Sequence, residues 1–388
     1  MGSQPSKATP AMSSRWSALP PELADLVLRR LPSLADRSRF ASVCRHWLHV
    51  ATRYSAPCLP RALPWLYLPD GSFQSLPDGE RHSFRRFRKH AWCSGSFGNW
   101  LLFQEEGRTC RHHFLTNPLT KATMRLPSYC NKPIYLNSDA AYSTRSRSIH
   151  FFIRKVIVCS SDLIAARVTY RFRRPDVVAC CRPGMSSWST GLCNGHVYDD
   201  MAFYKGKLYA VTIQGDLFAQ ELTDDCDTGE PRVSRNIEQV IRATPPLEAA
   251  RRCYLVISHT LKLLMVRWTP PRGSTKEMKL KVFEADLEMS QWLEVKSLDD
   301  QVLFVSSTCS KGISASDHGD YVQGNKIYFV DDGLGQIEFS DLVQIFSGGP
   351  TINPRTCGVY DMSSDTIHSI SLGELHISDR TKASWFFP

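Results

Sequence analysis

Apolar residues recur at helical spacing in one long stretch of the chain, residues 16–54. Within it, Pro20 and Pro21 pre-set the backbone of a first helical turn, and Pro32 ends that helix. Apolar positions at i, i+3, i+4 and i+8 predict one stripe along it, which comprises Leu23, Leu26, Val27 and Leu31. Such a stripe needs another surface to cover it.

Two further helices are predicted in the same stretch. The Ser33 hydroxyl is placed to cap the second helix, and Asp36 answers the free N–H groups of its first turn. The third helix is predicted over residues 44–54. The apolar positions of these two helices are Phe40, Val43, Trp47, Leu48 and Val50. Because so short a unit buries too little apolar area to be stable alone, we expect it to complete its core against a partner.

The pattern changes after residue 54, where prolines and Asp-Gly pairs interrupt any helix and indicate a connector. From about residue 97 onward, short runs rich in β-branched and aromatic residues alternate with turns. Examples of these runs are Trp100–Phe103, Ile149–Ile153 and Lys279–Phe283. Because long amphipathic helices are absent from the sequence pattern here, we predict an all-β domain.

Internal repeats narrow this prediction to a β-propeller. Residues 206–211 recur as 325–330, and Met185–Trp188 recurs as Met289–Trp292, at offsets of 119 and 104 residues. Such offsets fit blades of four strands that lie two or three blades apart. We expect the Trp and Tyr side chains to pack between blades, and a last strand at Trp385 to close the ring.

Residue types and spacing in the helical stretch resemble the F-box. The matching residues are Leu19, Pro20, Glu22, Leu23, Leu26, Val27, Leu31, Pro32, Asp36, Arg39, Val43, Cys44, Arg45 and Trp47. In that family the helices dock on a Skp-type adaptor, which holds a cullin and a RING protein. The resemblance implies that the adaptor-facing positions are Leu19, Pro20, Leu23, Leu26, Val27, Leu31, Val43 and Trp47. Arg37 and Ser38 depart from it, since the family often has an apolar residue there. A helical hairpin packed on the rest of the chain is the alternative.

The remainder of the chain resembles the plant F-box proteins that carry a C-terminal kelch-like β-propeller of undefined function. The residues that carry the resemblance are 116–120, Leu126, Pro127, 201–209, 282–286, Trp292, 304–308 and 324–328. The organisation expected from pattern and resemblance together is a flexible tail (1–15), the F-box (16–54), a Pro-rich connector with a basic segment (55–96) and the recognition propeller (97–388, or from about 60). The implied function is that of a substrate-recognition subunit of an SCF ubiquitin ligase, which recruits a target protein and is not itself an enzyme.

Charge and cysteine content change this picture little. The formal net charge of +9 is concentrated at residues 81–90 and 171–174, which indicates basic surface loops and leaves nucleic-acid binding as a weaker alternative. Thirteen cysteines without a C-x-x-C pair, after an N-terminus that lacks a signal peptide, favour reduced thiols in the cytoplasm or nucleus. The sequence contains no apolar run long enough to span a membrane, so we do not expect a membrane to be a partner of the chain.

Candidate chemistry is confined to one segment, residues 191–195, which has the G-x-C-x-G form of a nucleophile elbow around Cys193, with His196 beside it. An elbow needs a helix after its turn, and the residues from Val197 onward have the pattern of a strand. A turn between strands is therefore favoured, and a propeller enzyme or sugar-binding protein is the alternative function. The sequence predicts no catalytic, cofactor or metal-binding residues, and no cofactor.

Overall fold

The computed structural model describes residues 15–31, 33–54, 62–76, 79–83, 91–108, 110–130, 134–135, 151–170, 173–243, 252–269, 279–331, 356–370 and 383–388. The chain divides into two compact units, Met1–Leu63 and Pro64–Pro388, and each is presented by itself. In the described part of the chain, no helix has the length and apolar character needed to cross a membrane.

The first unit is helical, as predicted. It contains a 3-10 helix at Arg15–Ala18, α1 (Pro21–Arg29), α2 (Leu34–Ser42), α3 (Arg45–His49) and a π-helical turn at Val50–Tyr54. As predicted, α1 begins at the proline pair, where it has no side-chain cap. The predicted cap of α2 is present, since the Ser33 hydroxyl accepts a hydrogen bond from the N–H of Ala35. The third helix, predicted over residues 44–54, is divided between α3 and the π-helical turn.

Four side chains form the buried core of this unit, namely Ala24, Leu28, Phe40 and Val50. The indole of Trp47 stacks on Phe40 with ring centroids 4.3 Å apart, and its Nε1 donates to the carbonyl of Trp16 at 3.1 Å. His46 bonds the carbonyl of Leu19 through Nε2 at 2.8 Å. Trp47 therefore ties α2 and α3 to the start of the unit.

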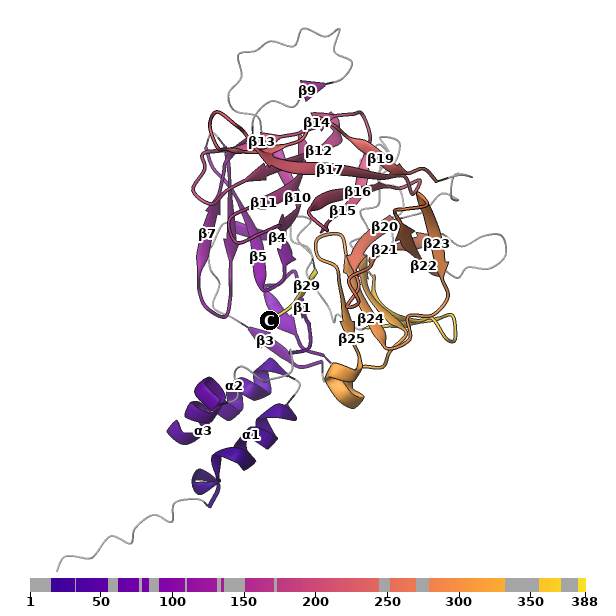
Figure 1. Ribbon diagram of the computed structural model, residues 1–388. Helices are drawn as coiled ribbons and strands as arrows, with labels where there is room; N and C mark the ends of the chain where they lie inside the picture. The colour runs from indigo at the N-terminus through magenta and orange to yellow at the C-terminus, as the bar shows by residue number, and fades with distance from the viewer. Residues whose placement is uncertain are drawn as a thin grey trace, which may run out of the picture. The chain divides into compact units, whose positions relative to one another are not determined.

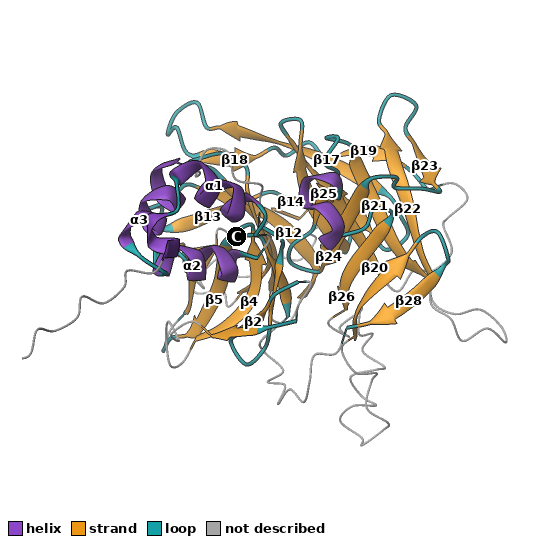
Figure 2. Cartoon of the chain, turned by 90° about the horizontal axis from the view of Figure 1, so that it is seen from below, coloured by secondary structure: helices purple, strands orange, loops and turns teal. Residues whose placement is uncertain are grey.

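The second unit is a set of β-sheets that follow one another in chain order around a ring (Figure 1). Figure 2 shows strands almost throughout it, with the 3-10 helix Ser316–Tyr321 beside β25. In hydrogen-bonding order, the first two sheets are β29 (Ser384–Phe386), β1 (Trp65–Tyr67), β2 (Ser72–Gln74), β3 (Arg81–Ser83); and β4 (Ala91–Phe97), β5 (Trp100–Glu106), β6 (Arg111–Thr116), β7 (Thr123–Leu126).

The third and fourth sheets each carry an extra strand. They are β10 (Phe151–Val158), β11 (Ile164–Tyr170), β12 (Arg173–Cys181), β13 (Ser187–Thr190), β8 (Tyr129–Cys130); and β15 (Tyr198–Tyr204), β16 (Lys207–Thr212), β17 (Leu217–Asp224), β18 (Pro231–Val233), with β19 (Glu238–Ile241) also on β17. A two-stranded pair joins β9 (Ile134–Tyr135) to β14 (Leu192–Cys193).

The last two sheets complete the ring. They are β20 (Arg252–Ile257), β21 (Leu263–Thr269), β22 (Lys279–Asp286), β23 (Gln291–Val295); and β25 (Lys311–Ser314), β24 (Gln301–Ser306), β26 (Lys326–Asp331), β27 (Thr356–Asp361), β28 (Thr366–Ser369). β24 and β26 pair in parallel, whereas the other pairs of these two sheets are antiparallel.

The inner strands close this ring, because each contacts the next in the order β29, β4, β10, β15, β20, β24 and back to β29. The closing strand β29 pairs antiparallel with β1, with Leu66 opposite Trp385. The unit is thus a six-bladed β-propeller, and the predicted closure at Trp385 is confirmed. Closure leaves the ring without open edges between its first and last blades.

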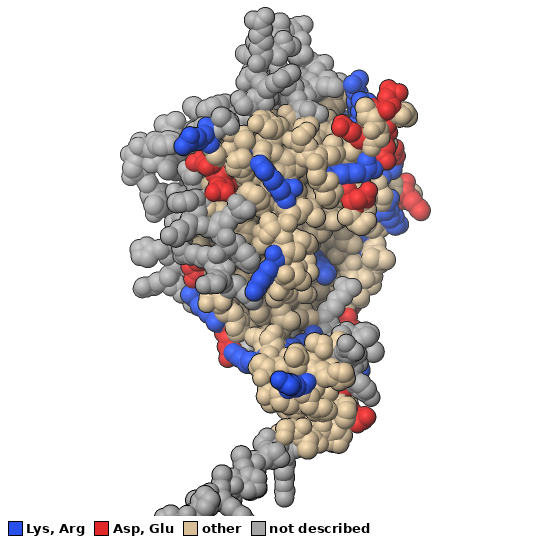
Figure 3. Space-filling view, turned by 90° about the vertical axis from the view of Figure 1, so that its left-hand side faces the viewer, with Lys and Arg blue, Asp and Glu red and all other residues tan. Residues whose placement is uncertain are grey.

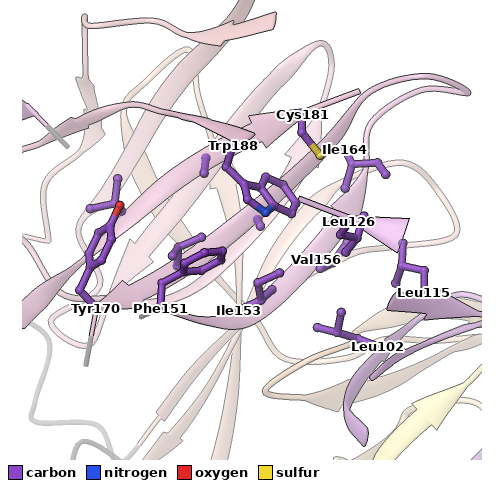
Figure 4. Close-up of a cluster of buried hydrophobic side chains, with 14 of the residues drawn as sticks. Leu102, Leu115, Leu126, Phe151, Ile153, Val156, Ile164, Tyr170, Cys181 and Trp188 are labelled. Atoms are coloured by element: carbon purple, nitrogen blue, oxygen red, sulfur yellow. The ribbon is translucent and has the colours of Figure 1, made fainter. Parts of the chain in front are cut away.

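Aromatic side chains fill the spaces between blades, as predicted. Trp188 lies in the cluster between the second and third blades (Figure 4), where its Nε1 donates to the carbonyl of Pro127 at 3.0 Å. Trp268 meets Phe329 of the sixth blade edge-on at 4.6 Å. Trp385 donates from Nε1 to the carbonyl of Val305 at 3.0 Å, which joins the first blade to the sixth.

The repeats also take their predicted places, since each pair lies two blades apart. β16 and β26 contain the first pair, and β13 and β23 contain the second. The boundary of the propeller needs a correction, because β1 to β3 and the start of β4 lie within the predicted connector. The propeller begins near Pro64, at the earlier of the two predicted starts, since short strands form between the prolines.

Candidate adaptor-binding surface

The helical unit leaves several large apolar side chains exposed, although its own core is complete. The exposed fraction is 48% for Leu23, 51% for Leu26 and 39% for Val27, all on α1, whereas Ala24 and Leu28 of the same helix are fully buried. Trp16, Val43 and Leu48 are also exposed. We call the six residues Trp16, Leu23, Leu26, Val27, Val43 and Leu48 the apolar surface.

The eight predicted adaptor-facing residues separate into two groups. Those that are exposed are Pro20, Leu23, Leu26, Val27 and Val43. Those that are half-buried and pack on the unit's own core are Leu19, Leu31 and Trp47. The three apolar side chains of α1 share one side of that helix, while Val43 lies at the C-terminal end of α2. The role of all eight in binding stays a prediction.

Two members of the apolar surface, Trp16 and Leu48, were not among the predicted adaptor-facing residues. Trp16 lies in the 3-10 helix that precedes α1, and Leu48 lies in α3 beside Trp47. Their exposure depends on how the helices pack, which the motif does not encode. Of the two departures from the F-box pattern, Arg37 donates from Nε to the carbonyl of Leu31 at 2.7 Å, and Ser38 bonds the carbonyl of Leu34.

The nucleophile-elbow motif has no elbow context. Cys193 ends the short strand β14 and is followed by β15 rather than by a helix. Its side chain is buried, and burial raises the pKa of the thiol, which disfavours the thiolate. The exposed His196 packs against Phe218, with ring centroids 4.6 Å apart. This arrangement is that of a turn between strands.

A group of buried charges lies where three blades meet. Lys155 of β10 donates from Nζ to Asp200 of β15 at 2.7 Å, and the second oxygen of Asp200 accepts the N–H of Leu255 in β20 at 2.8 Å. Asp199 likewise accepts the N–H of Cys253 in β20. These carboxylates satisfy backbone donors of the neighbouring blade, so we assign them a structural role.

Other site types find little support in the described residues. No group of three or more His, Cys, Asp and Glu side chains in that part of the chain could hold a metal ion. On the side drawn in Figure 3, Lys and Arg lie singly or beside acidic side chains and form no continuous basic stripe. The predicted basic cluster at residues 81–90 falls mostly outside the described residues, which include only 81–83.

Comparison with known proteins places the propeller in a family. Residues 73–361 match the family model described as the KIB1-4 β-propeller. The F-box protein At2g26160 of Arabidopsis thaliana is 23% identical over 345 residues, which cover 82% of this chain and 96% of that protein. The F-box protein SKIP23 of the same plant is 22% identical over 401 residues, which cover 92% and 91%. Because 92% coverage of 388 residues leaves about 31 unmatched, the second similarity extends into the helical unit.

Proposed function

Because this chain belongs to the KIB1-4 β-propeller family and its relatives are named F-box proteins, we propose that it is the substrate-recognition subunit of an SCF-type ubiquitin ligase. Its helical unit binds a Skp-type adaptor and, through it, a cullin and a RING protein. Its propeller holds the target protein, in the cytoplasm or nucleus. The chain contributes proximity, since it turns the encounter of a target lysine with a ubiquitin thioester into a nearly intramolecular step.

The apolar surface is the observation that carries this proposal. Complete burial of a leucine that is about half exposed contributes roughly 1 kcal/mol of favourable free energy. Six such side chains together favour association by several kcal/mol, which is enough for the centre of an interface of roughly 1,600 Å². The exposed apolar area does not contribute to the core of the helical unit, because Ala24, Leu28, Phe40 and Val50 already form that core.

The test is the double substitution Leu23→Asp with Leu26→Asp in the full chain. Two carboxylates in place of anchors would lower the affinity for a purified Skp adaptor by more than about a hundredfold, as measured by co-purification and calorimetry. Both side chains are outside the helical core, so the circular dichroism spectrum should not change. The matched control is Leu261→Asp, which places the same charge at a 72% exposed leucine of the propeller. Unchanged adaptor binding by the double variant would contradict the proposal.

The alternative of a propeller enzyme is tested separately with Cys193→Ser. A hydrolase that used this thiol would lose its activity on substitution. We expect instead that the variant retains whatever the propeller binds, because Cys193 is buried beside a turn.

A further inference from the structure

Two turns of the fifth blade lie at the same edge of its sheet. The strands β20, β21, β22 and β23 pair antiparallel in that order and lie together in Figure 1. In such a sheet the turn between the first two strands, residues 258–262, and the turn between the last two, residues 287–290, are at one edge. The Nζ of Lys262 lies 2.8 Å from the carboxylate of Glu284, so the first turn is tied to the end of the third strand.

Each of these turns exposes a large apolar side chain. Among the large apolar residues that the structure describes, Leu261 and Met289 have the highest exposed fractions, 72% and 69%. In the apolar surface of the helical unit the highest value is 64%, at Trp16. Leu293 of β23 is also exposed, so the same blade carries a third such side chain. We call Leu261 and Met289 the turn pair.

The backbone at Leu261 is strained as well. Its φ of 58° lies in the left-handed region, which glycine and asparagine adopt readily and which a bulky residue seldom adopts. A leucine here therefore combines an unfavourable backbone conformation with an apolar side chain that the fold leaves in water. Neither feature favours the folded propeller, and strained residues of this kind cluster at functional positions.

The side chains around the turn pair are acidic. Residues 282–295 contain four Asp and Glu and no Lys or Arg, in a protein whose formal net charge is +9. Two of the four are paired with lysines. The other two, Asp286 and Glu288, closely precede Met289 and have no cationic partner in the part of the chain that the structure describes. A basic partner can therefore pair with two carboxylates beside the exposed apolar side chains.

We propose that the turn pair, with Asp286 and Glu288, forms the target-docking surface of the propeller, and that the target supplies a short segment whose large apolar side chains are flanked by Lys or Arg. Burial of both apolar residues favours such a complex, and the two carboxylates select a basic segment. This inference rests on the proposed function, because it identifies where and by what chemistry a target binds.

The acidic side chains also disfavour the other occupants of an exposed apolar surface. A second copy of this chain in a symmetric contact would place Asp286 and Glu288 opposite the same residues of the other copy, and like charges would repel. The phosphates of a nucleic acid would be repelled in the same way.

The test measures binding of the full chain to a fluorescent peptide in which a pair of leucines is flanked on each side by lysines. Comparison probes are the same peptide with Glu for Lys and the same peptide with Ser for Leu. We expect the Leu–Lys peptide to bind at least about tenfold more tightly than either, because only it satisfies both the turn pair and the carboxylates. If either comparison peptide binds as tightly, the proposal is overturned.

Apolar variants then locate the surface. Leu261→Asp with Met289→Asp should weaken binding of the Leu–Lys peptide by about tenfold or more. The matched control is Leu119→Asp, which places the same charge at an exposed leucine of the second blade and should leave binding unchanged. Equal losses in the variant and its control would show that the peptide does not bind at the turn pair.

Charge variants test the choice of partner. Asp286→Asn with Glu288→Gln should weaken binding about fivefold, and the affinity that remains should depend less on salt. The control Asp227→Asn with Glu230→Gln removes two exposed carboxylates from the corresponding turn of the fourth blade, between β17 and β18, and should change nothing. Equal effects of the two double variants would show that binding follows net charge alone, which would refute the docking surface.

A milder substitution separates docking from a structural role of the leucine. Because asparagine adopts the left-handed region more readily, Leu261→Asn should not lower Tm, whereas it should weaken peptide binding about threefold. A fall in Tm with unchanged binding would show that Leu261 serves the fold, and would overturn the proposal.

Two further measurements on the same proteins assign the outcome. Sedimentation of the unmodified chain should give a monomer; a dimer that Leu261→Asp dissociates would assign the turn pair to a second copy and refute target docking. Adaptor binding should be the same in all of these variants and should be lost only in Leu23→Asp with Leu26→Asp. Failure of the docking surface is thereby distinguished from failure of the proposed function.

Discussion

Removal of the Trp385 side chain should open the ring at its closure. The indole is fully buried, meets Phe304 edge-on at 5.0 Å and bonds the carbonyl of Val305. Replacement of a buried Trp by Ala costs about 3–5 kcal/mol, and loss of its hydrogen bond adds roughly 1 kcal/mol. That total is about 5 kcal/mol, out of about 5–15 kcal/mol for a typical domain.

The assay is thermal unfolding followed by far-ultraviolet circular dichroism. For a unit of the size of Pro64–Pro388, the unfolding entropy is about 0.7 kcal/mol/K, so 5 kcal/mol corresponds to a fall in Tm of about 7 °C. Trp385→Phe retains an aromatic ring against Phe304 and should lower Tm by only about 2 °C. A fall of less than about 2 °C for Trp385→Ala would refute the claim that this contact closes the ring.

Two further predictions concern buried ionisable side chains. Lys155→Met leaves the buried Asp200 carboxylate without its cation, and should lower the free energy of unfolding, measured in urea, by about 3–5 kcal/mol. The control Lys262→Met breaks a surface pair of similar length (2.8 Å) and should lower it by less than about 1 kcal/mol; equal losses would contradict the structural role of the buried pair. Burial, together with the positive charge of the nearby Arg111, lowers the pKa of His113 from the ordinary 6.5 to about 3. The neutral ring therefore stabilises the fold fully above about pH 6.5, and this contribution declines as the pH falls toward 3. The free energy of unfolding should therefore drop by about 2 kcal/mol between pH 6.5 and pH 5, and His113→Leu should show a drop smaller by that amount; an unchanged pH slope would refute this.

The helix boundaries were predictable from the sequence because their signals are local. A proline pair starts α1 and the Ser33 hydroxyl caps α2, and neither depends on distant residues. The inward side of α1 was not predictable in the same way. Apolar residues occupy positions 23, 24, 26, 27 and 28, so two sides of the helix could each serve as a core face. Packing against Phe40 and Val50 selects the side of Ala24 and Leu28.

The strands of the propeller were predictable in type, but the contacts between blades were not. Lys155 illustrates the reason, because β10 carries a register shift between Ile153 and Lys155. A bulge of this kind breaks the alternation of inward and outward positions, and it brings the lysine into contact with Asp200, 45 residues away. The strand order of the sixth blade was not predictable either, because β24 pairs in parallel with β26, although β25 lies between them in the sequence.

The side chains that the helical unit exposes predict how its binding to an adaptor responds to salt. The helical unit offers leucines and valines, so its association with an adaptor should draw mainly on apolar burial, which salt does not screen. Attraction between exposed charges, by contrast, fades as the screening length falls from roughly 10 Å at 0.1 M salt to 3 Å at 1 M. A titration of salt therefore tests the apolar surface. Adaptor binding should persist at 1 M salt, and its loss there would show that the apolar surface is not what holds the adaptor.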